Sequence, residues 1–454
     1  MSLTGWVGER LDVRLQDPPG HHPVRLSDLA GLAVRRNPRR AHLVVSRVLG
    51  KHLPVDPRLS YAAARLLGER AAQVLGAAGR PRPLGPLADA LRGNAAALAG
   101  LAFAPEDCAV LRRAPLVIGY AETATALGHA VADAFAGARY LHSTRRSVEG
   151  VAAAGTFDEA HSHATEHLLL PADPRWLHED APVVLVDDEL TTGRTAVATI
   201  EALHRLRPRE HYVVATLLDL RTPEHRAKVD AAAARLGARI DVVALAAGVV
   251  EHPEDVLERA AELIARLDTQ PAAPGAAGGP AHVRRLVATW PGDLPEGGRH
   301  GFDAADRADL RATVGVFAGE VLAALPERGS VLVLGTEELM YTPLALATEL
   351  AVRRGPVRFS STTRSPVLAV DEPGYAIRTR LEFPSHDGTG GPRFAYNVAG
   401  AGFDAIVLVV DGTAETPALW AEDGLVSALR TECADLTVAV VPDFQPAPVL
   451  AGRA

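Results

Sequence analysis

One segment constrains the fold of this chain more than any other: residues 183–196, which read VVLVDDELTTGRTA. Four apolar residues typical of a buried strand run directly into two acids, and Thr191-Thr192-Gly193 then opens the helical pattern at 196–206. Strand, turn and helix in this order are the repeating unit of a parallel α/β sheet. Ligands of such sheets bind at the carboxyl ends of the strands, so the acids and the turn are predicted to line a binding site.

The residues at this strand end have complementary chemistry. A Thr/Gly turn at a helix N-terminus offers hydroxyls, backbone N–H groups and the positive end of the helix dipole, all of which suit a phosphate. Asp187 and Asp188 would repel a phosphate, but carboxylates accept hydrogen bonds from vicinal hydroxyls. The segment therefore predicts a ribose-phosphate site in which the two acids hold the 2′- and 3′-hydroxyls. The 5′-phosphate would bind to Thr191, Thr192, Gly193, Arg194 and Thr195. The alternative is an ordinary strand end with an incidental acidic turn.

This pattern closely resembles the motif with which type I phosphoribosyltransferases bind phosphoribosyl pyrophosphate (PRPP). Arg194 departs from the motif, since family members often have a small residue there, and it adds a positive charge beside the phosphate. The resemblance implies a glycosyltransferase of the pentosyl class, with a parallel sheet, flanking helices and a hood. It also implies Mg²⁺ as the cofactor, held mainly through PRPP, and assigns no protein ligand to the metal.

A second strand, turn and helix lies upstream at residues 116–128 (LVIGYAETATALG). At the corresponding place the family has a loop that holds pyrophosphate through backbone amides. The matching residues are Gly119, Tyr120, Ala121, Glu122, Thr123 and Ala124. Glu122 is unusual where an anion must bind, so we expect it to contact Mg²⁺ or to orient a neighbour. The alternative is an ordinary strand–helix turn.

Between these segments, residues 141–150 and 152–167 are small, polar and poorly periodic, which predicts a long mobile loop. Its position resembles that of the flexible catalytic loop of orotate-type enzymes, which closes over PRPP. Arg145 and Arg146 stand where those enzymes have a lysine-bearing basic pair, and the planar, multidentate guanidinium suits pyrophosphate. His161 and His163 have several open roles: pyrophosphate contact, proton delivery, part of a metal cluster, or a solvated loop.

The N-terminal stretch 37–54 (NPRRAHLVVSRVLGKHLP) is basic, which by itself fits a strand on a solvated surface. Its end, VLGKHLP, resembles the hood segment that helps to recognise the base in orotate phosphoribosyltransferases. Lys51, one of only two lysines in the chain, is therefore expected to contact the base or the pyrophosphate. Asp56-Pro57, just beyond, is typical of a helix start.

The chain is predicted to divide at residues 268–281 (DTQPAAPGAAGGPA), a Pro-, Gly- and Ala-rich stretch typical of a flexible linker. This linker separates a phosphoribosyltransferase domain with its hood, residues 1–267, from a smaller domain at 282–454. Short β-branched runs alternate with helical patterns in both parts, so both domains are expected to be α/β.

The C-terminal domain resembles a degenerate copy of the first. Residues 331–351, 360–365 and 406–416 parallel the segments that begin at 116, 142 and 183. The aligned pairs are Gly335 with Gly119, Glu338 with Glu122, Arg364 with Arg146, and Asp411 with Asp188. Asp187 becomes Val410, and Glu415 stands in the turn, where it would repel a phosphate. This copy is therefore predicted to be catalytically inactive. The alternative is a chance alignment of two generic α/β units.

The order of these features, with Thr363-Arg364-Ser365-Pro366 in the second domain, resembles a bacterial family in which an orotate-type phosphoribosyltransferase precedes a TRSP domain. Its members are associated with tellurite-resistance-type clusters for a nucleoside-like metabolite. The resemblance implies an unidentified base or nucleotide as second substrate, in either reaction direction, and other pathway enzymes as partners. Because orotate-type enzymes are dimers, we expect a homodimer, or an internal pseudo-dimer in which Arg364 supports the site of the first domain.

Composition narrows the classes of protein to which this chain could belong. The net charge of −8 lacks the basic excess of a nucleic-acid binder, and no apolar run is long enough to span a membrane. The N-terminus has no signal-peptide pattern, and Cys108 and Cys433 match no metal or redox spacing, so a cytoplasmic protein is expected. Two other interpretations stay open: a PRPP-sensing regulator without turnover, and a scaffold whose TRSP domain docks pathway enzymes.

Overall fold

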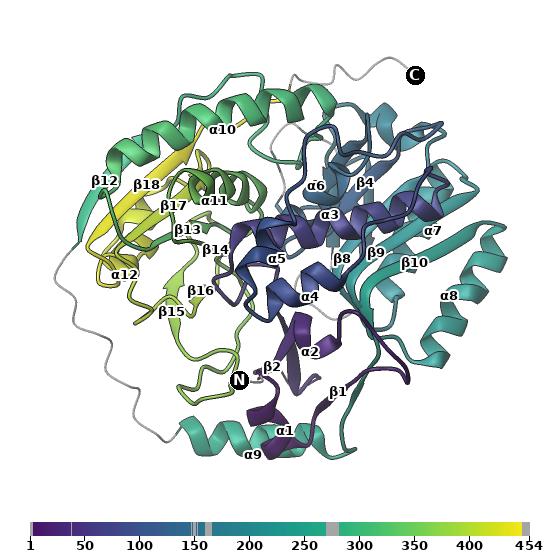
Figure 1. Ribbon diagram of the computed structural model, residues 1–454, viewed down its shortest axis with the longest axis horizontal. Coiled ribbons are helices and arrows are strands. Elements are labelled where there is room, and N and C mark those ends of the chain that lie inside the picture. The colour runs from purple at the N-terminus through teal and green to yellow at the C-terminus, as the bar shows by residue number, and fades with distance from the viewer. Residues whose placement is uncertain are drawn as a thin grey trace.

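The computed structural model describes residues 3–268, apart from 38, 147, 149, 150, 152 and 159–165, and residues 281–446. Most of the predicted linker, at 269–280, lies outside the described residues, as do His161 and His163. Two parallel sheets lie side by side, one built from residues before residue 269 and one from residues after 280 (Figure 1).

The first sheet has five parallel strands in the order β10-β9-β8-β4-β5. Its strands are β4 (Leu116–Gly119), β5 (Arg139–His142), β8 (Val183–Leu190), β9 (His211–Asp219) and β10 (Arg239–Ala247). The apolar residues of β4 and β8 are buried, as expected for strands covered on both faces. Its helices are α6 (Thr125–Ala132), α7 (Arg194–Leu206) and α8 (Pro223–Leu236). The predicted strands near 116, 183 and 212 are confirmed.

The N-terminal residues form the hood. It contains α1 (Gly5–Leu11), β1 (Arg14–Gln16), α2 (Leu26–Leu29) and the hairpin of β2 (Ala30–Val34) and β3 (His42–Ser46). β1 pairs with β11 (Val249–Glu251). The hood is followed by α3 (Pro57–Val74), whose predicted start is confirmed because the Asp56 side chain accepts a hydrogen bond from the Arg58 N–H. The remaining helices of this half are α4 (Gly85–Leu91), α5 (Ala95–Ala99) and α9 (Val256–Asp268).

The segment predicted to be an irregular loop after β5 contains a hairpin of β6 (Gly155–Asp158) and β7 (Glu166–Leu169). The prediction was therefore wrong for these residues. Each strand has only four residues, and backbone pairing holds them without the alternating pattern that a longer half-buried strand would show. Thr144 and Leu168 exchange backbone hydrogen bonds of 2.9 Å, so β7 is anchored at the end of the sheet. A 3₁₀ turn follows at Pro174–His178.

The second sheet has five parallel strands in the order β12-β18-β17-β13-β14. Its strands are β12 (His282–Val287), β13 (Val331–Gly335), β14 (Val357–Ser361), β17 (Ala405–Asp411) and β18 (Asp435–Val441). Its helices are α10 (Ala304–Ala324), α11 (Tyr341–Arg353) and α12 (Leu425–Leu429), with a 3₁₀ turn at Pro417–Trp420. A hairpin of β15 (Arg380–Pro384) and β16 (Pro392–Tyr396) extends beyond it.

The two sheets correspond at four strand positions. β13, β14, β17 and β18 take the places of β4, β5, β8 and β9, and the hairpin β15–β16 takes the place of β6–β7. The fifth position differs in connectivity, because β10 follows β9 in the chain whereas β12 precedes every other strand of its sheet. The second domain is therefore α/β and has the strand order expected of a related unit.

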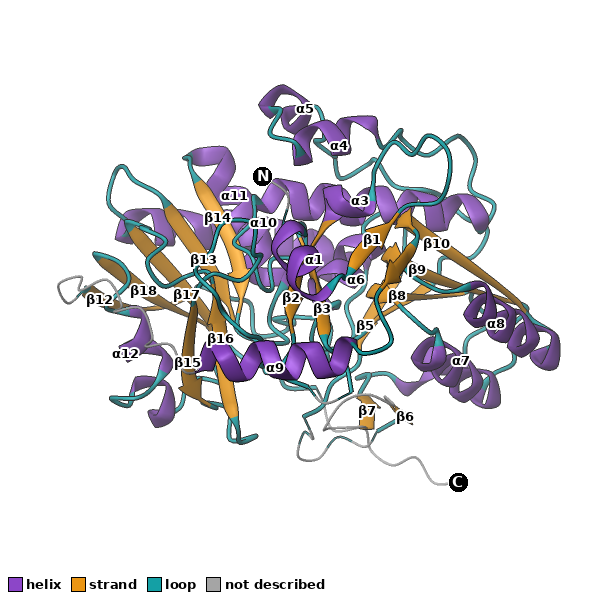
Figure 2. Cartoon of the chain, turned by 90° about the horizontal axis from the view of Figure 1, so that it is seen from below, coloured by secondary structure: helices purple, strands orange, loops and turns teal. Residues whose placement is uncertain are grey.

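Helices in equivalent places pack against each other between the sheets. His129 of α6 stacks on Tyr341 of α11, with ring centroids 3.6 Å apart. Asp133 accepts hydrogen bonds from Tyr341 at 2.6 Å and from Tyr61 of α3 at 3.0 Å. In Figure 2, α3, α6 and α11 lie between the two sheets, while α7 and α8 cover the outer face of the first. The largest cluster of buried apolar side chains draws on both domains, so they share one core.

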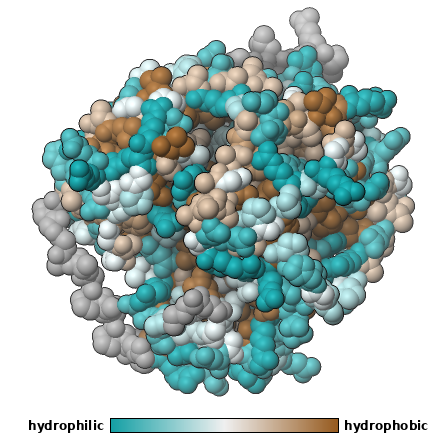
Figure 3. Space-filling model, viewed as in Figure 1, coloured by the Kyte–Doolittle hydropathy of each residue, from teal (hydrophilic) through white to brown (hydrophobic). Residues whose placement is uncertain are grey.

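Apolar and hydrophilic residues are interspersed over the face shown in Figure 3. Among the described residues, no helix is both long and apolar enough to cross a membrane. Cys108 and Cys433 are not joined in a disulfide.

Candidate active site

A cavity of about 340 Å³ lies where β4 and β8 end. Three parts of the chain line it: the hood, the strand ends of the first sheet, and a short segment of the second domain. The predicted site residues that line it are Lys51, Tyr120, Ala121, Glu122, Thr123, Arg145, Asp187, Asp188, Thr191, Thr192, Gly193, Arg194, Thr195 and Arg364. The tertiary structure thus brings together residues that are up to several hundred positions apart in the chain.

The acids at the end of β8 form the floor of the cavity. The Asp188 N–H donates a hydrogen bond to Asp187 Oδ1 at 2.9 Å. Glu189, the next residue, forms an ion pair of 2.7 Å with Arg40 of the β2–β3 hairpin. Burial raises the pKa of Asp188 and Glu189 adds to the increase, while Lys51 acts in the opposite direction. A ligand that donates hydrogen bonds to this carboxylate would stabilise its charged form, which burial disfavours.

The turn after β8 is shaped to receive an anion. Gly193 is the N-cap of α7 and has φ +77°, a left-handed conformation that glycine adopts without steric cost. Glycine has no side chain to cap the helix, and a helix N-terminus suits an anion. The Arg194 N–H itself donates a long hydrogen bond of 3.4 Å to Thr192 Oγ1. Arg194 begins the helix and places a positive charge beside this N-terminus.

The turn after β4 is compact because glycine starts it. A Cβ at Gly119 would lie 2.6 Å from Ala124 O and 2.7 Å from the Tyr140 hydroxyl, so a larger residue would force the loop open. The Ala121 N–H donates to Ser143 Oγ at 3.0 Å. From the hood, Lys51 Nζ donates to Thr123 Oγ1 at 2.8 Å, which places its positive charge on this loop.

Glu122 is the acid within this loop, and it is buried. Arg364 of the second domain reaches it, with Nε 2.6 Å from Glu122 Oε1. Burial raises the pKa of Glu122, and Glu337 adds to the increase, whereas Arg364, Lys51 and Arg145 lower it. Of the two roles expected from the sequence, this contact favours the orientation of a neighbour.

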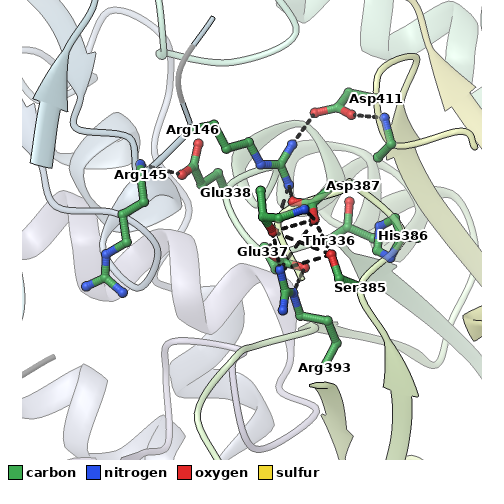
Figure 4. A network of polar contacts seen from close by, with 12 residues as sticks. Arg145, Arg146, Thr336, Glu337, Glu338, Ser385, His386, Asp387, Arg393 and Asp411 are labelled. Carbon is green, nitrogen blue, oxygen red and sulfur yellow. Dashed lines mark hydrogen bonds and ion pairs between the residues drawn. The ribbon is translucent and has the colours of Figure 1, made fainter. Parts of the chain in front are cut away.

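The two arginines after β5 point to different places. Arg145 lines the cavity, and its Nη2 lies 3.5 Å from His167 Nε2. Arg146, expected at the pyrophosphate, instead extends into the second domain and is buried there, as Figure 4 shows. Its guanidinium lies 2.7 Å from Asp387 and 3.7 Å from Asp411. The expectation for Arg146 is therefore corrected, because the chain bends at these two residues and their side chains reach different domains.

Arg146 enters a network of buried ion pairs at the equivalent site of the second domain (Figure 4). Arg393 Nε donates to Glu337 Oε1 at 2.7 Å, and Arg299 lies 3.3 Å from Glu338 and 3.7 Å from Asp411. Asp411, the acid at the position equivalent to Asp188, is therefore already paired with Arg146 and Arg299 of the protein itself.

Strand register defines which residues of the two domains correspond. The Ser143 N–H bonds to Gly119 O, and the Thr362 N–H bonds to Gly335 O, both at 3.0 Å. Arg364 is therefore equivalent to Arg145, one residue from the pairing with Arg146 that the letters HSTRRS and SSTTRS suggest. The pairing of Asp411 with Asp188 is confirmed, since β4–β8 and β13–β17 have matching registers. Letter matching missed the shift because register follows the hydrogen-bond ladder.

Several hood residues in the cavity were not singled out from the sequence. They are Arg35, Arg36, Asn37, Arg40, Leu43, Val44 and His52. The available signal was the arginine-rich run at 35–40 between two short apolar stretches. Burial lowers the pKa of His52 well below its ordinary value, and Lys51 and Arg35 lower it further, so this ring is neutral.

Two family models match the chain. The model described as phosphoribosyl transferase covers residues 29–249, and the model of the TRSP domain that lies C-terminal to that transferase covers residues 296–429. No curated protein matches.

The solved structures with partial likeness include three adenine phosphoribosyltransferases. The Rhodothermus marinus protein is 21% identical over 30% of this chain and 70% of that one, with a TM-score of 0.22. The Giardia lamblia enzyme complexed with 9-deazaadenine is 25% identical over 29% and 69%, with a TM-score of 0.23. The Trypanosoma brucei enzyme, in complex with AMP, pyrophosphate and ribose-5-phosphate, is 16% identical over 29% and 56%, with a TM-score of 0.22. TM-scores of this size add nothing to the family models. On those two models and their order along the chain, the protein belongs to the phosphoribosyltransferase family that carries a C-terminal TRSP domain.

Proposed function

We propose that this protein transfers the phosphoribosyl group between PRPP and a base, in one direction or the other. One observation carries the proposal: a single cavity joins the acids Asp187 and Asp188, the turn 191–195, and residues 120–123 of the loop 119–124. Acceptors for ribose hydroxyls thus lie beside donors for a phosphate, and a second loop with cations lies within reach of the same ligand. PRPP is a ribose with a phosphate at one end and a pyrophosphate at the other.

The charge of the cavity suits such a ligand. Seven Arg or Lys side chains and four Asp or Glu side chains line it. An excess of cations in a partly enclosed site favours a polyanion and raises its local concentration. The whole chain, by contrast, has a net charge of −8.

The roles of the residues follow from the bond that breaks. When the C1–oxygen bond of PRPP cleaves, positive charge develops on the ribose and negative charge on the departing pyrophosphate. Asp187 and Asp188 hold the ribose, and the turn 191–195 with Arg194 holds its 5′-phosphate. The loop 119–124, Lys51 and Arg145 receive the pyrophosphate, and Arg364 reaches the same loop from the second domain.

The residues present fit Mg²⁺ that arrives with the substrate. Among the described residues, no group of three or more His, Cys, Asp or Glu is arranged to hold a metal ion. Mg²⁺ in such sites is commonly held by one or two carboxylates together with substrate phosphate oxygens, and Asp187 and Asp188 supply carboxylates here. When bound, the ion neutralises charge on the diphosphate.

The proposal includes an internal pseudo-dimer of residues 1–267 and 282–454. The matching strand order and the packing of α6 against α11 support it. Two crossed contacts also support it: Arg364 pairs with Glu122, and Glu338, the equivalent of Glu122, accepts from the N–H of Arg145 at 3.1 Å. Equivalent groups therefore meet across the boundary, as in an isologous interface.

The test is base-dependent turnover. The full-length protein is incubated with Mg²⁺ and PRPP labelled in the ribose, together with a panel of purines, pyrimidines and related heterocycles. We expect one class of base to release pyrophosphate and to yield a labelled nucleotide. Tight PRPP binding without turnover with any base would favour a sensor. Absence of PRPP binding by calorimetry would show that the proposal is wrong.

A further inference from the structure

Glu122 stands in a loop that the proposed function assigns to pyrophosphate, yet it carries the same sign of charge as that ligand. Three cations surround its carboxylate: Arg364 at 2.6 Å, Lys51 on the adjoining Thr123, and Arg145 as a further electrostatic neighbour. These are the cations that would hold the leaving group. The carboxylate therefore lies where its charge both competes with pyrophosphate and neutralises the groups that bind it.

The contact between Arg364 and Glu122 is close but is not a directed hydrogen bond. The Arg364 Nε–H donates to Glu337 Oε2 at 3.0 Å, so it points into the second domain. Among the described residues, Glu122 Oε1 accepts no hydrogen bond, and Arg364 Nη2 is buried without a hydrogen-bond partner. The pair thus rests on charge attraction alone. Arg364 Nη2 forms an ion pair of 3.6 Å with Asp387 Oδ2 but no hydrogen bond within the described part of the chain, so it can still donate to another anion.

The acid at the equivalent position of the second domain, Glu338, is held by hydrogen bonds and an ion pair. Glu338 accepts hydrogen bonds from Thr144 Oγ1 at 2.8 Å and from the Arg145 N–H at 3.1 Å. Arg299 lies 3.3 Å from it. Burial alone would raise the pKa of Glu338, but Arg299, Arg146, His142 and the hydrogen bond from Thr144 together outweigh burial and lower it to about 2.

The two equivalent acids therefore differ in how well their charge is stabilised. The pKa of Glu338 is lowered, whereas burial raises that of Glu122. A buried charge whose surroundings favour its neutral form is held at a cost in free energy, and that cost is relieved when the charge is displaced or takes up a proton. Glu338 is therefore held in place by its hydrogen bonds and ion pairs, whereas another anion can displace Glu122 from Arg364.

From these contacts we infer that Glu122 is an internal substitute for pyrophosphate, which neutralises Arg364 until the leaving group of PRPP takes its place. The inference rests on the proposed function. Without substrate, Glu122 joins Glu337 and Asp387 in neutralising the Arg364 guanidinium between the domains. When Mg²⁺–PRPP binds, Arg364 exchanges Glu122 for diphosphate oxygens. After transfer, Glu122 competes with pyrophosphate for Arg364 and favours its release. Glu122 is then a positioning residue, and Arg364 is the contribution of the TRSP domain to the active site.

The experiment compares Mg²⁺–pyrophosphate and Mg²⁺–PRPP binding by calorimetry in the full-length protein and three variants. Glu122→Gln removes the competing charge with little change in shape, so we expect pyrophosphate to bind about tenfold more tightly. Arg364→Gln should weaken binding by about tenfold or more. Glu349→Gln is the matched control, because Glu349 pairs with Arg353 on α11 and does not line the cavity. Its effect on pyrophosphate affinity should be the smallest of the three.

A double variant and a kinetic readout separate this role from a merely structural one. The gain from Glu122→Gln should shrink when Arg364 is also replaced by Gln. Product inhibition by pyrophosphate should become stronger in Glu122→Gln, and KM for PRPP should fall. Glu122→Ala should also tighten pyrophosphate binding, and it is the second variant in case the Gln amide disturbs the loop. Weaker or unchanged pyrophosphate binding in both Glu122 variants would overturn the inference while leaving the proposed function intact. A wild-type protein that binds neither ligand would overturn both.

Discussion

Arg364 Nε of the second domain lies 2.6 Å from Glu122 Oε1 of the first, across 242 positions of sequence. The contact makes the cavity a product of both domains, because Thr363, Ser365 and Pro366 line it beside Arg364. The residues that give the TRSP segment its name therefore form one wall of the proposed PRPP site. The C-terminal domain therefore contributes residues to the proposed PRPP site itself.

The first prediction concerns the acids at the end of β8. Asp187→Asn combined with Asp188→Asn should weaken Mg²⁺–PRPP binding by roughly 2–3 kcal/mol, because hydrogen bonds to charged acceptors are lost. Both residues are only partly buried, so the fold should persist, with an unchanged thermal transition. Calorimetric titration measures the affinity, and Glu224→Gln, an exposed acid on α8, is the control. Equal PRPP affinity in the double variant and the control would contradict the assignment.

The second prediction separates the two arginines after β5. Arg146→Ala should destabilise the folded protein by about 3–5 kcal/mol, because the buried Asp387 and Asp411 each lose a cation partner and keep only more distant arginines or an equally distant one. Arg145→Ala should change stability by less than about 1 kcal/mol, as is usual for partly exposed charges, and should instead reduce PRPP affinity. Urea unfolding followed by circular dichroism measures both. A reversed order of stability would contradict the placement of Arg146.

The third prediction concerns acid pH. The pKa of Glu338 is about 2 in the folded protein, below its ordinary value of 4.5. A lowered folded-state pKa contributes stability that is present above pH 4.5 and is lost as the pH falls toward 2. The loss amounts to roughly 3 kcal/mol at one pKa unit per 1.36 kcal/mol. Unfolding free energy measured from pH 5 to pH 2 should fall less steeply in Glu338→Gln. Parallel slopes for the two proteins would argue against the ion pairs around Glu338.

The fourth prediction concerns the boundary between the domains. Tyr341→Ala removes the ring that stacks on His129, so it should cost about 3–5 kcal/mol and lower the stability of both domains together. Tyr341→Phe keeps the stack and loses only the hydrogen bond to Asp133, so it should cost about 1 kcal/mol. Differential scanning calorimetry should show one transition in each case. A protein truncated after Leu267 would expose the shared core and should aggregate. A monomeric truncated protein with full activity would show that the domains are independent.

The sequence alone was sufficient to predict those parts of the site whose structure depends only on neighbouring residues. Residues 183–196 form a strand, an acidic end, a glycine turn and a helix because each feature depends on neighbours within a few positions. The same holds for the strand before the loop 119–124, which begins at Leu116 as predicted, whereas the helix after it begins at Thr125, later than its letters indicated. Lys51, singled out through its place in a short motif, lines the cavity, and its contact with the base or the pyrophosphate stays a prediction.

The tertiary structure decided everything that depends on direction and on distant partners. Sequence patterns could not assign Arg145 to the cavity and Arg146 to the second domain, because these directions depend on a bend of the chain and on distant acids that pair with Arg146. Nor could they show that Arg364 matches Arg145, since strand register is set by backbone hydrogen bonds that no letter comparison contains. The pairing of Arg364 with Glu122 required the two sheets to pack through α6 and α11. Local order follows from interactions between near neighbours, whereas the meeting of distant charges follows from the burial of a shared apolar core.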